Sequence, residues 1–107
     1  MKIIRNNIIP FKGFAAINLF GILFVRKDAV ITERTLRHEA IHTAQMKELF
    51  YIGFYILYIW YWIVNLFHYK FSNHIAYRNI CFEKEAYIYS AYENYLEYRQ
   101  KFAWINL

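Results

Sequence analysis

Residues 49–67 restrict the fold of this chain more than any other stretch, because nineteen consecutive positions carry no charged side chain. About twenty apolar residues are enough for a helix to cross a lipid bilayer. The overlapping stretch 54–69 is apolar on all sides of a helix, which is typical of a helix buried all round or lying in lipid. Its Tyr and Trp side chains and Asn65 favour the headgroup region or a protein interior over the hydrocarbon core.

The pattern H-E-x-x-H precedes this run, in the sequence RHEAIH. Residues four apart share one face of a helix, so His38 and His42 can direct ring nitrogens at one metal ion. Zinc binds imidazole readily, and hydrolytic zinc sites keep a position for water. Glu39 follows the first histidine, where its carboxylate can take a proton from that water. The spacing predicts a zinc-dependent hydrolase with Glu39 as general base; the alternative is two surface histidines, with Glu39 paired to Arg34 or Arg37.

A catalytic zinc site needs a third protein ligand. An extension of the motif does not supply it, because Glu48 stands where a third histidine would be. Gln45 replaces the glycine that would turn the chain, so the helix carries Glu48 off the histidine face. His68 and His74 are further candidates, although a capping or interfacial role explains each of them more simply.

The remaining source is a later helix that contains the sequence FEKEAYIYS. Its Glu83 and Glu85 lie about 200° apart around a helix, so one alone can face the metal. We choose Glu83, because Ala86 and Ser90 on its side are small and let two helices approach closely. Glu85 is then expected to be a solvated charge or a partner of a ligand histidine.

A metal site of this kind excludes a single membrane crossing at residues 49–67. His38 and His42 precede the run and Glu83 follows it, so a crossing would separate the ligands. We therefore expect the run to fold back as a helix that is buried against protein or lies on a membrane surface. Its aromatic stripe, which includes Tyr51, Tyr55, Tyr58 and Trp62, is expected to serve packing or an interface more than a substrate pocket.

The N-terminal part should supply a small β element. Residues 1–13 are expected to be an extended leader that ends at the turn-like sequence PFKG. Residues 14–27 hold two short apolar runs around Gly21, which favours a hairpin over the alternative of a helix. Thr32 resembles an N-cap for the H-E-x-x-H helix.

Gly53 is expected to bend or end the H-E-x-x-H helix, and Ser72 or Asn73 to cap a third helix over about residues 75–101. The predicted class is mainly α with a small β element, that is α+β. In it the H-E-x-x-H helix packs on the glutamate helix, beside one very apolar, aromatic-rich helix. We expect a single domain over residues 1–107.

Composition bears on the partners of the chain. Hydrophobic residues make up 59% of only 107 residues, more than so small a domain can bury, so a partner subunit or a membrane surface is expected to cover some. The net charge of +5 is spread along the chain, and we expect no nucleic-acid partner. Cys81 is the only cysteine, and the N-terminus lacks a cleavable signal pattern. The expected location is cytoplasmic or membrane-associated.

With H-E-x-x-H followed by E-x-x-A on a later helix, the chain resembles the gluzincin metallopeptidases, above all the minimal minigluzincins. It is also similar to small bacterial proteins with H-E-x-x-H-x-x-Q and F-E-x-E-A-Y motifs. The resemblance covers about residues 14–100 and implies peptide hydrolysis with His38, His42 and Glu83 as zinc ligands and Glu39 as base. In many gluzincins Asp follows E-x-x-A and orients a ligand histidine; Tyr87 stands there in this chain.

The resemblance implies three further features. The strand near Ile22–Arg26 would bind an extended peptide at its edge. A Tyr or His would stabilise the oxyanion, with His74, Tyr77 and Tyr87 as unranked candidates. The enzyme would be latent, with the terminal FAWINL, residues 102–107, lying in the cleft. The competing hypothesis is a non-enzymatic, membrane-associated or oligomeric protein whose H-E-x-x-H is vestigial and whose aromatic helix is the interaction surface.

Overall fold

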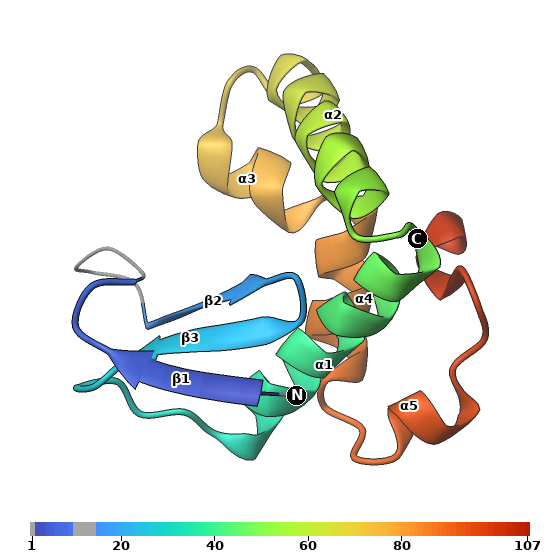
Figure 1. Cartoon of the computed structure of the whole chain (residues 1–107). Helices are drawn as coiled ribbons and strands as arrows, with labels where there is room; N and C mark the ends of the chain where they lie inside the picture. The colour runs from blue at the N-terminus through green and yellow to red at the C-terminus, as the bar shows by residue number, and fades with distance from the viewer. Residues whose placement is uncertain (1, 10–14) are drawn as a thin grey trace.

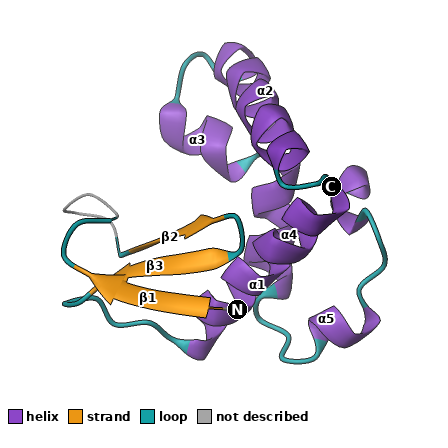
Figure 2. Cartoon of the chain, viewed as in Figure 1, coloured by secondary structure: helices purple, strands orange, loops and turns teal. Residues whose placement is uncertain are grey.

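The computed structural model describes residues 2–9 and 15–107. They form a three-stranded sheet on one side of the molecule and a group of helices on the other (Figures 1 and 2). Helices account for 55% of the described residues and strands for 14%, so the predicted α+β class is confirmed. The PFKG sequence, predicted as a turn, lies outside the described residues.

The sheet has the strand order β1-β3-β2, with β1 (Lys2–Asn6), β2 (Ala16–Leu19) and β3 (Ile22–Arg26). The predicted hairpin is present: β2 and β3 are antiparallel, and Phe20 and Gly21 between them have φ values of 53° and 86°. Two positive φ angles match the twist of the flanking strands. The extended leader becomes β1, parallel to β3. The central strand is therefore β3, and the prediction that Ile22–Arg26 offers a free edge is wrong; β1 and β2 are the two edge strands.

The H-E-x-x-H helix is α1 (Glu33–Glu48), and the apolar helix is α2 (Ile52–His68). Thr32 caps α1 as predicted, accepting a hydrogen bond from the Thr35 amide at 3.1 Å. The break between the helices lies at Phe50 and Tyr51, with φ values of 55° and 63°, and the two helices are bent by 108°. Gly53 lies inside α2, so the prediction that it ends the first helix is wrong.

The prediction of one long third helix over about residues 75–101 is also wrong. This part of the chain instead forms α3 (Asn73–Arg78), α4 (Cys81–Tyr89) and α5 (Tyr95–Tyr98). A 3-10 turn, η1 (Ala103–Asn106), follows them. Ile80 is extended, with ψ of 132°, and its side chain is fully buried in the core beside Phe82. This kink lets α3 pack on α2 while α4 packs on α1. Ser72 occupies the predicted cap position of α3 without a side-chain cap bond.

The main core lies where α1, α2, α4 and the C-terminal segment meet. Its buried members are Met46, Phe54, Ile80, Phe82 and Trp104. Among the described residues, no single helix meets the length and hydropathy of a membrane span, whereas the bent pair α1 and α2 meets them together.

Candidate metal centre

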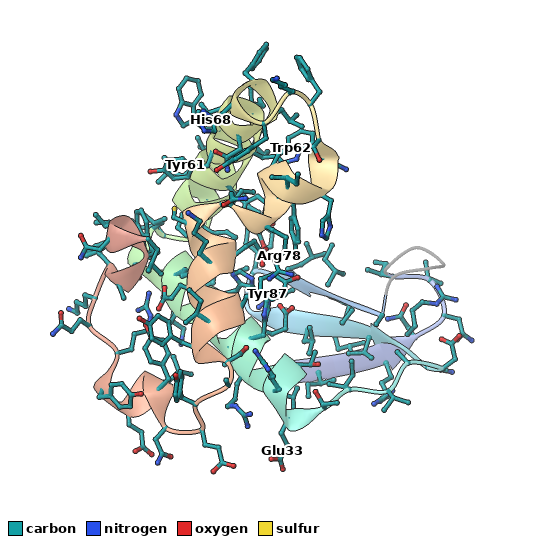
Figure 3. The ribbon with its side chains drawn as sticks, turned by 180° about the vertical axis from the view of Figure 1, so that it is seen from behind. Glu33, Tyr61, Trp62, His68, Arg78 and Tyr87 are labelled. Carbon is teal, nitrogen blue, oxygen red and sulfur yellow. The ribbon has the colours of Figure 1, made fainter. Side chains whose placement is uncertain are left out.

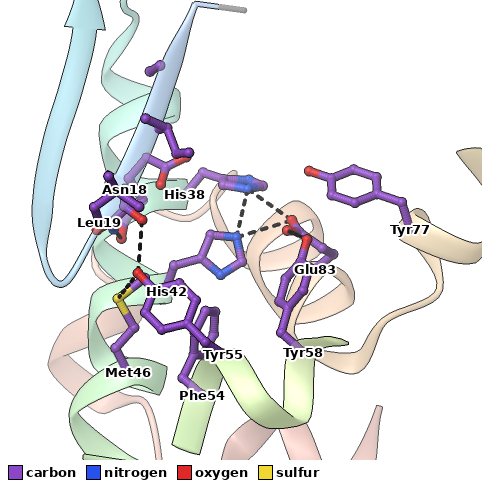
Figure 4. A pocket seen from close by; sticks show the side chains of 13 residues that line it. Asn18, Leu19, His38, His42, Met46, Phe54, Tyr55, Tyr58, Tyr77 and Glu83 are labelled. Carbon is purple, nitrogen blue, oxygen red and sulfur yellow. Dashed lines mark hydrogen bonds and ion pairs between the residues drawn. The ribbon is translucent and has the colours of Figure 1, made fainter. Parts of the chain in front are cut away.

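The packing of α1 against α4 brings the three predicted ligands together (Figure 4). Nε2 of His42 lies 3.1 Å from Nε2 of His38 and 3.1 Å from Oε1 of Glu83, and Nε2 of His38 lies 3.3 Å from the same oxygen. Among the described residues, these three alone form a group of His, Cys, Asp or Glu able to share one metal ion. All three are mostly shielded from solvent.

The spacing of these atoms fits zinc. Ligand atoms held tetrahedrally at the usual zinc distances of about 2.0–2.2 Å lie about 3.3–3.6 Å from one another. The three observed separations, 3.1, 3.1 and 3.3 Å, are close to those values. Two imidazoles and one carboxylate are also a ligand set used by hydrolytic zinc sites, which leave the fourth position open.

Tyr58 of α2 determines which oxygen of Glu83 faces the histidines. Its hydroxyl donates to Oε2 of Glu83 at 2.6 Å, which leaves Oε1 directed at His38 and His42. Burial acts to raise the pKa of Glu83, but the charge of His42 and hydrogen bonds from both histidines and Tyr58 outweigh it and lower the pKa. Glu83 is therefore an anion at neutral pH.

Gln45, one turn after His42, fixes the tautomer of this histidine. The Gln45 side-chain nitrogen donates at 3.0 Å both to the Phe82 carbonyl and to Oε1 of Glu85. Both partners only accept, so the Gln45 oxygen faces His42 Nδ1, 2.8 Å away, and Nδ1 must donate. In the neutral ring, Nε2 then presents its lone pair to His38 and Glu83.

The Nε2 lone pair of His42 and the carboxylate of Glu83 would repel each other unless a cation lay between them. In the metal-free chain that cation is a proton: burial acts to lower the pKa of His42, but the charge of Glu83 and their hydrogen bond raise it to about 9. A zinc ion at this position would serve the same purpose.

Glu85 is buried, so it is not the solvated charge that was one expectation for it. It accepts hydrogen bonds from Gln45, from the Tyr95 hydroxyl and from the Arg99 guanidinium. These bonds lower the pKa of Glu85 against the opposing effect of burial. Through Gln45, Glu85 supports His42, which is the partner role that was the other expectation. Glu48 lies off the histidine face as predicted and binds Arg99 at 2.9 Å.

His38 is held by a ring contact. Its imidazole and the Tyr87 ring meet edge to face, with centroids 4.7 Å apart, so Tyr87, the residue after E-x-x-A, packs against this histidine. Figure 3 shows Arg78 and Tyr87 side by side, and the Arg78 guanidinium lies 3.8 Å from the centre of that ring. Arg34 and Arg37, offered above as partners for Glu39, instead donate to the main chain of α4 and its C-terminal end, at Tyr87 and Ser90 respectively.

A cleft of about 260 Å³ opens beside the three ligands, between the edge strand β2, α1 and α2. Glu39 lines it on the α1 side, as its predicted role as a base requires. The aromatic stripe was expected to serve packing more than a pocket, yet Tyr55 and Tyr58 line the cleft; this expectation is corrected for these two residues. The remaining lining residues are Ala16, Ile17, Asn18, Leu19, His38, His42, Met46, Phe54, Tyr77 and Glu83.

Asn18 joins the edge strand to the H-E-x-x-H helix, a role that the sequence did not indicate. Its side-chain nitrogen donates to the Glu39 carbonyl at 3.1 Å and to the Thr43 hydroxyl at 3.0 Å. Its side-chain oxygen accepts from the Gly21 amide at 3.1 Å in the hairpin turn. Its carbonyl accepts from Tyr55 at 3.2 Å. These four bonds set the position of β2 relative to Glu39.

The structure separates the three oxyanion candidates. Tyr77 lines the cleft together with the ligands, whereas His74 is exposed beside a different cavity. The Tyr87 hydroxyl lies 3.4 Å from that of Tyr77, and Tyr87 lines a neighbouring cavity that it shares with Tyr77 and His38. Burial, with the nearby charge of Glu83, raises the pKa of Tyr77, so this hydroxyl keeps its proton for donation.

The C-terminal segment does not lie in the cleft, so the expected blocking role of residues 102–107 is wrong. Trp104 is buried against Phe82, with ring centroids 4.8 Å apart, and donates to Glu48 at 3.2 Å. The Phe102 amide also donates to Glu48. The segment therefore packs behind the metal centre, on the side of the Glu85 and Arg99 pair.

No family model, curated protein or solved structure matches this chain.

Proposed function

We propose that the chain is a zinc-dependent metallopeptidase of the gluzincin type. The observation that carries the proposal is the convergence of His38 Nε2, His42 Nε2 and Glu83 Oε1 to within 3.3 Å of one another, beside a cleft that Glu39 lines. The three residues would hold the metal. When bound, zinc would polarise the substrate carbonyl and make a water molecule more acidic.

Each of the surrounding side chains would have a separate task. Glu39 would take the proton of the attacking water and deliver it to the leaving amine. The Tyr77 hydroxyl would donate a hydrogen bond to the oxygen on which negative charge develops, which favours the transition state over the bound substrate. Tyr58 would keep Glu83 oriented, and Gln45 would keep His42 in the tautomer that binds metal.

The edge strand β2 is suited to hold an extended peptide or protein substrate. The Arg26 amide donates to the Ala15 carbonyl, and Ile17 is paired with Phe24, so alternate residues bond to β3. Ala16 and Asn18 therefore direct their main-chain groups away from β3, and both residues line the cleft. A substrate strand added at Ala16 would place its carbonyl near the metal centre.

Metal analysis of the purified protein tests this function first. We expect about one equivalent of zinc, retained by a His68→Ala, His74→Ala control and lost by a His38→Ala, His42→Ala variant. Glu39→Gln should keep the metal and lose hydrolysis of a fluorogenic peptide library by at least about a hundredfold. Protein that folds but takes up no stoichiometric zinc would rule the proposal out.

A further inference from the structure

A surface helix usually buries its apolar face and exposes its polar face, whereas α2 does the reverse. Side chains with polar atoms face the protein: Tyr55 binds the Asn18 carbonyl, Tyr58 binds Glu83, and Asn65 binds the Ala76 carbonyl at 3.1 Å. The exposed positions are pure hydrocarbon or aromatic, apart from His68 at the end of the helix. They are Ile52, Ile56, Ile59, Trp60, Ile63, Val64 and Phe67, here called the outer stripe.

The outer stripe is continuous. At 100° per residue its seven members fall within an arc of about 140° along the whole helix. Trp60 is 59% exposed and Phe67 69% exposed, so the side chains stand in solvent. An uninterrupted apolar face of this length is typical of a surface that is covered in use. The opposite arc is packed against α1, α3 and α4, so one side of α2 is free to meet a partner.

The exposed charged side chains between residues 47 and 82 are all basic. An exposed lysine and an exposed phenylalanine lie next to each end of α2 in the chain. Lys47 lies in the last turn of α1 and is followed by Phe50, which is 88% exposed, while Lys70 and Phe71, which is 66% exposed, come just after α2. Residues 49–82 contain no Asp or Glu. A second copy of the chain would place lysine opposite lysine in either antiparallel or parallel pairing of the stripes, which opposes self-association. An anionic lipid headgroup layer is instead complementary to lysines that flank an apolar face.

We propose that α2 docks on an anionic membrane surface, with the outer stripe in the headgroup and upper acyl region and Lys47 and Lys70 among the lipid headgroups. Tyr55 and Tyr58 line the cleft from the opposite arc of the helix, so docking leaves the cleft open. The proposal does not depend on zinc or on peptidase activity. It places the metal centre beside a membrane, where it would meet membrane-associated peptides.

Flotation of the full-length protein with lipid vesicles tests the docking. Vesicles of phosphatidylcholine with about a third phosphatidylglycerol should bind the protein, and vesicles of phosphatidylcholine alone should bind it at least about tenfold more weakly. High salt should reduce binding to the anionic vesicles. Failure to bind the anionic vesicles, or equal binding to both kinds, would overturn the proposal.

Two sets of variants locate the surface. Ile56→Ser, Trp60→Ser and Phe67→Ser together should weaken vesicle binding by about tenfold per side chain. The matched control is Ile8→Ser with Val30→Ser, two exposed apolar positions elsewhere, at 80% and 88% exposure; it should bind as the wild type does.

The lysines are tested in the same way. Lys47→Glu and Lys70→Glu should each weaken binding by at least about fivefold, whereas Lys27→Glu, an exposed lysine elsewhere, should have a small effect. Circular dichroism checks that each variant is folded. The His38→Ala, His42→Ala protein should still bind vesicles, so failure of this proposal is distinct from failure of the peptidase proposal. Light scattering that shows a lipid-free dimer, lost in the outer-stripe variant, would overturn membrane docking in favour of self-association.

Discussion

The side-chain oxygen of Gln45 lies 2.8 Å from Nδ1 of His42, and the orientation of the amide requires that nitrogen to donate. In the neutral ring His42 is thereby left with a lone pair on Nε2, the atom that faces His38 and Glu83. A histidine that binds metal usually donates its other ring hydrogen to a carboxylate, a carbonyl or water. In this chain a glutamine amide provides that acceptor, and Glu85 holds the amide in place.

Replacing Gln45 should therefore weaken metal binding more than it changes the fold. We expect Gln45→Ala to lower zinc affinity about 10–100-fold, the usual effect of removing such a partner. Competition with a chromophoric chelator measures the affinity, and Gln100→Ala, an exposed glutamine, is the matched control. Unchanged affinity in a folded Gln45→Ala protein would mean that the tautomer of His42 is set in another way.

Substitution of the two glutamates of α4 should affect different properties, zinc binding for Glu83 and folding stability for Glu85. Glu83→Gln should remove zinc binding, since an amide is a poor zinc ligand, and leave a folded protein. Glu85→Ala should destabilise the fold by about 3–5 kcal/mol, because it breaks the buried pair with Arg99, which keeps only Glu48, and removes the acceptor of Gln45 and Tyr95. Urea unfolding and zinc content, measured on both variants, separate the two roles. Equal loss of stability in both variants would contradict the assignment of metal binding to Glu83 and of structural support to Glu85.

The sequence predicted the grouping of His38, His42 and Glu83 better than the surroundings of this cluster, for physical reasons. Helical spacing brings His38 and His42 together, and the small residues Ala86 and Ser90, both buried, allow α4 to approach α1 on the Glu83 side. These are local relationships. The role of Gln45 depends on Glu85, forty positions later, whereas in the sequence this residue stands out only as the replacement of a glycine and as the last position of H-E-x-x-H-x-x-Q.

The breaks at Phe50–Tyr51 and at Ile80 were not predicted, because they depend on packing, whereas the break before α3 was predicted. Phe50 and Tyr51 adopt positive φ without glycine, and Ile80 becomes extended because its side chain is drawn into the core. The position of β3 at the centre of the sheet follows from its pairing with β1, about twenty positions away, which alternation within the hairpin cannot reveal. The sequence also does not show which face of α2 is buried, because hydrophobic and aromatic residues occur on all sides of this helix.

Zinc binding should strengthen as pH rises. In the metal-free protein the pKa of His42 is raised from 6.5 to about 9, while the pKa of Glu83 is lowered, so at pH 7 a proton on His42 must leave before zinc binds. Apparent affinity should increase about tenfold per pH unit between pH 7 and 9 and level off above that. Titration calorimetry in buffers of different ionisation enthalpy should register about one released proton at pH 7. No proton release there would contradict the shift.

The raised pKa of His42 also predicts how the stability of the metal-free protein depends on pH. A histidine whose folded-state pKa is raised stabilises the fold fully below its unfolded pKa of 6.5, and this contribution is lost as pH rises through about 9. Urea unfolding of the metal-free protein should therefore show a decline between these pH values. The decline should be absent from His42→Ala, which serves as the control, and its persistence there would assign it to another group.

Removal of residues 102–107 should reduce zinc occupancy and stability and should not raise peptidase activity. Trp104 packs on Phe82 and donates to Glu48, which also binds Arg99; Arg99 in turn holds Glu85. Truncation would leave a cavity beside Phe82, at a cost of about 3–5 kcal/mol, and would loosen the support of His42 through Glu85. Trp104→Phe, which keeps most of the packing, should lose much less. Higher peptidase activity after truncation, with zinc retained, would instead show that the segment blocks the site in solution.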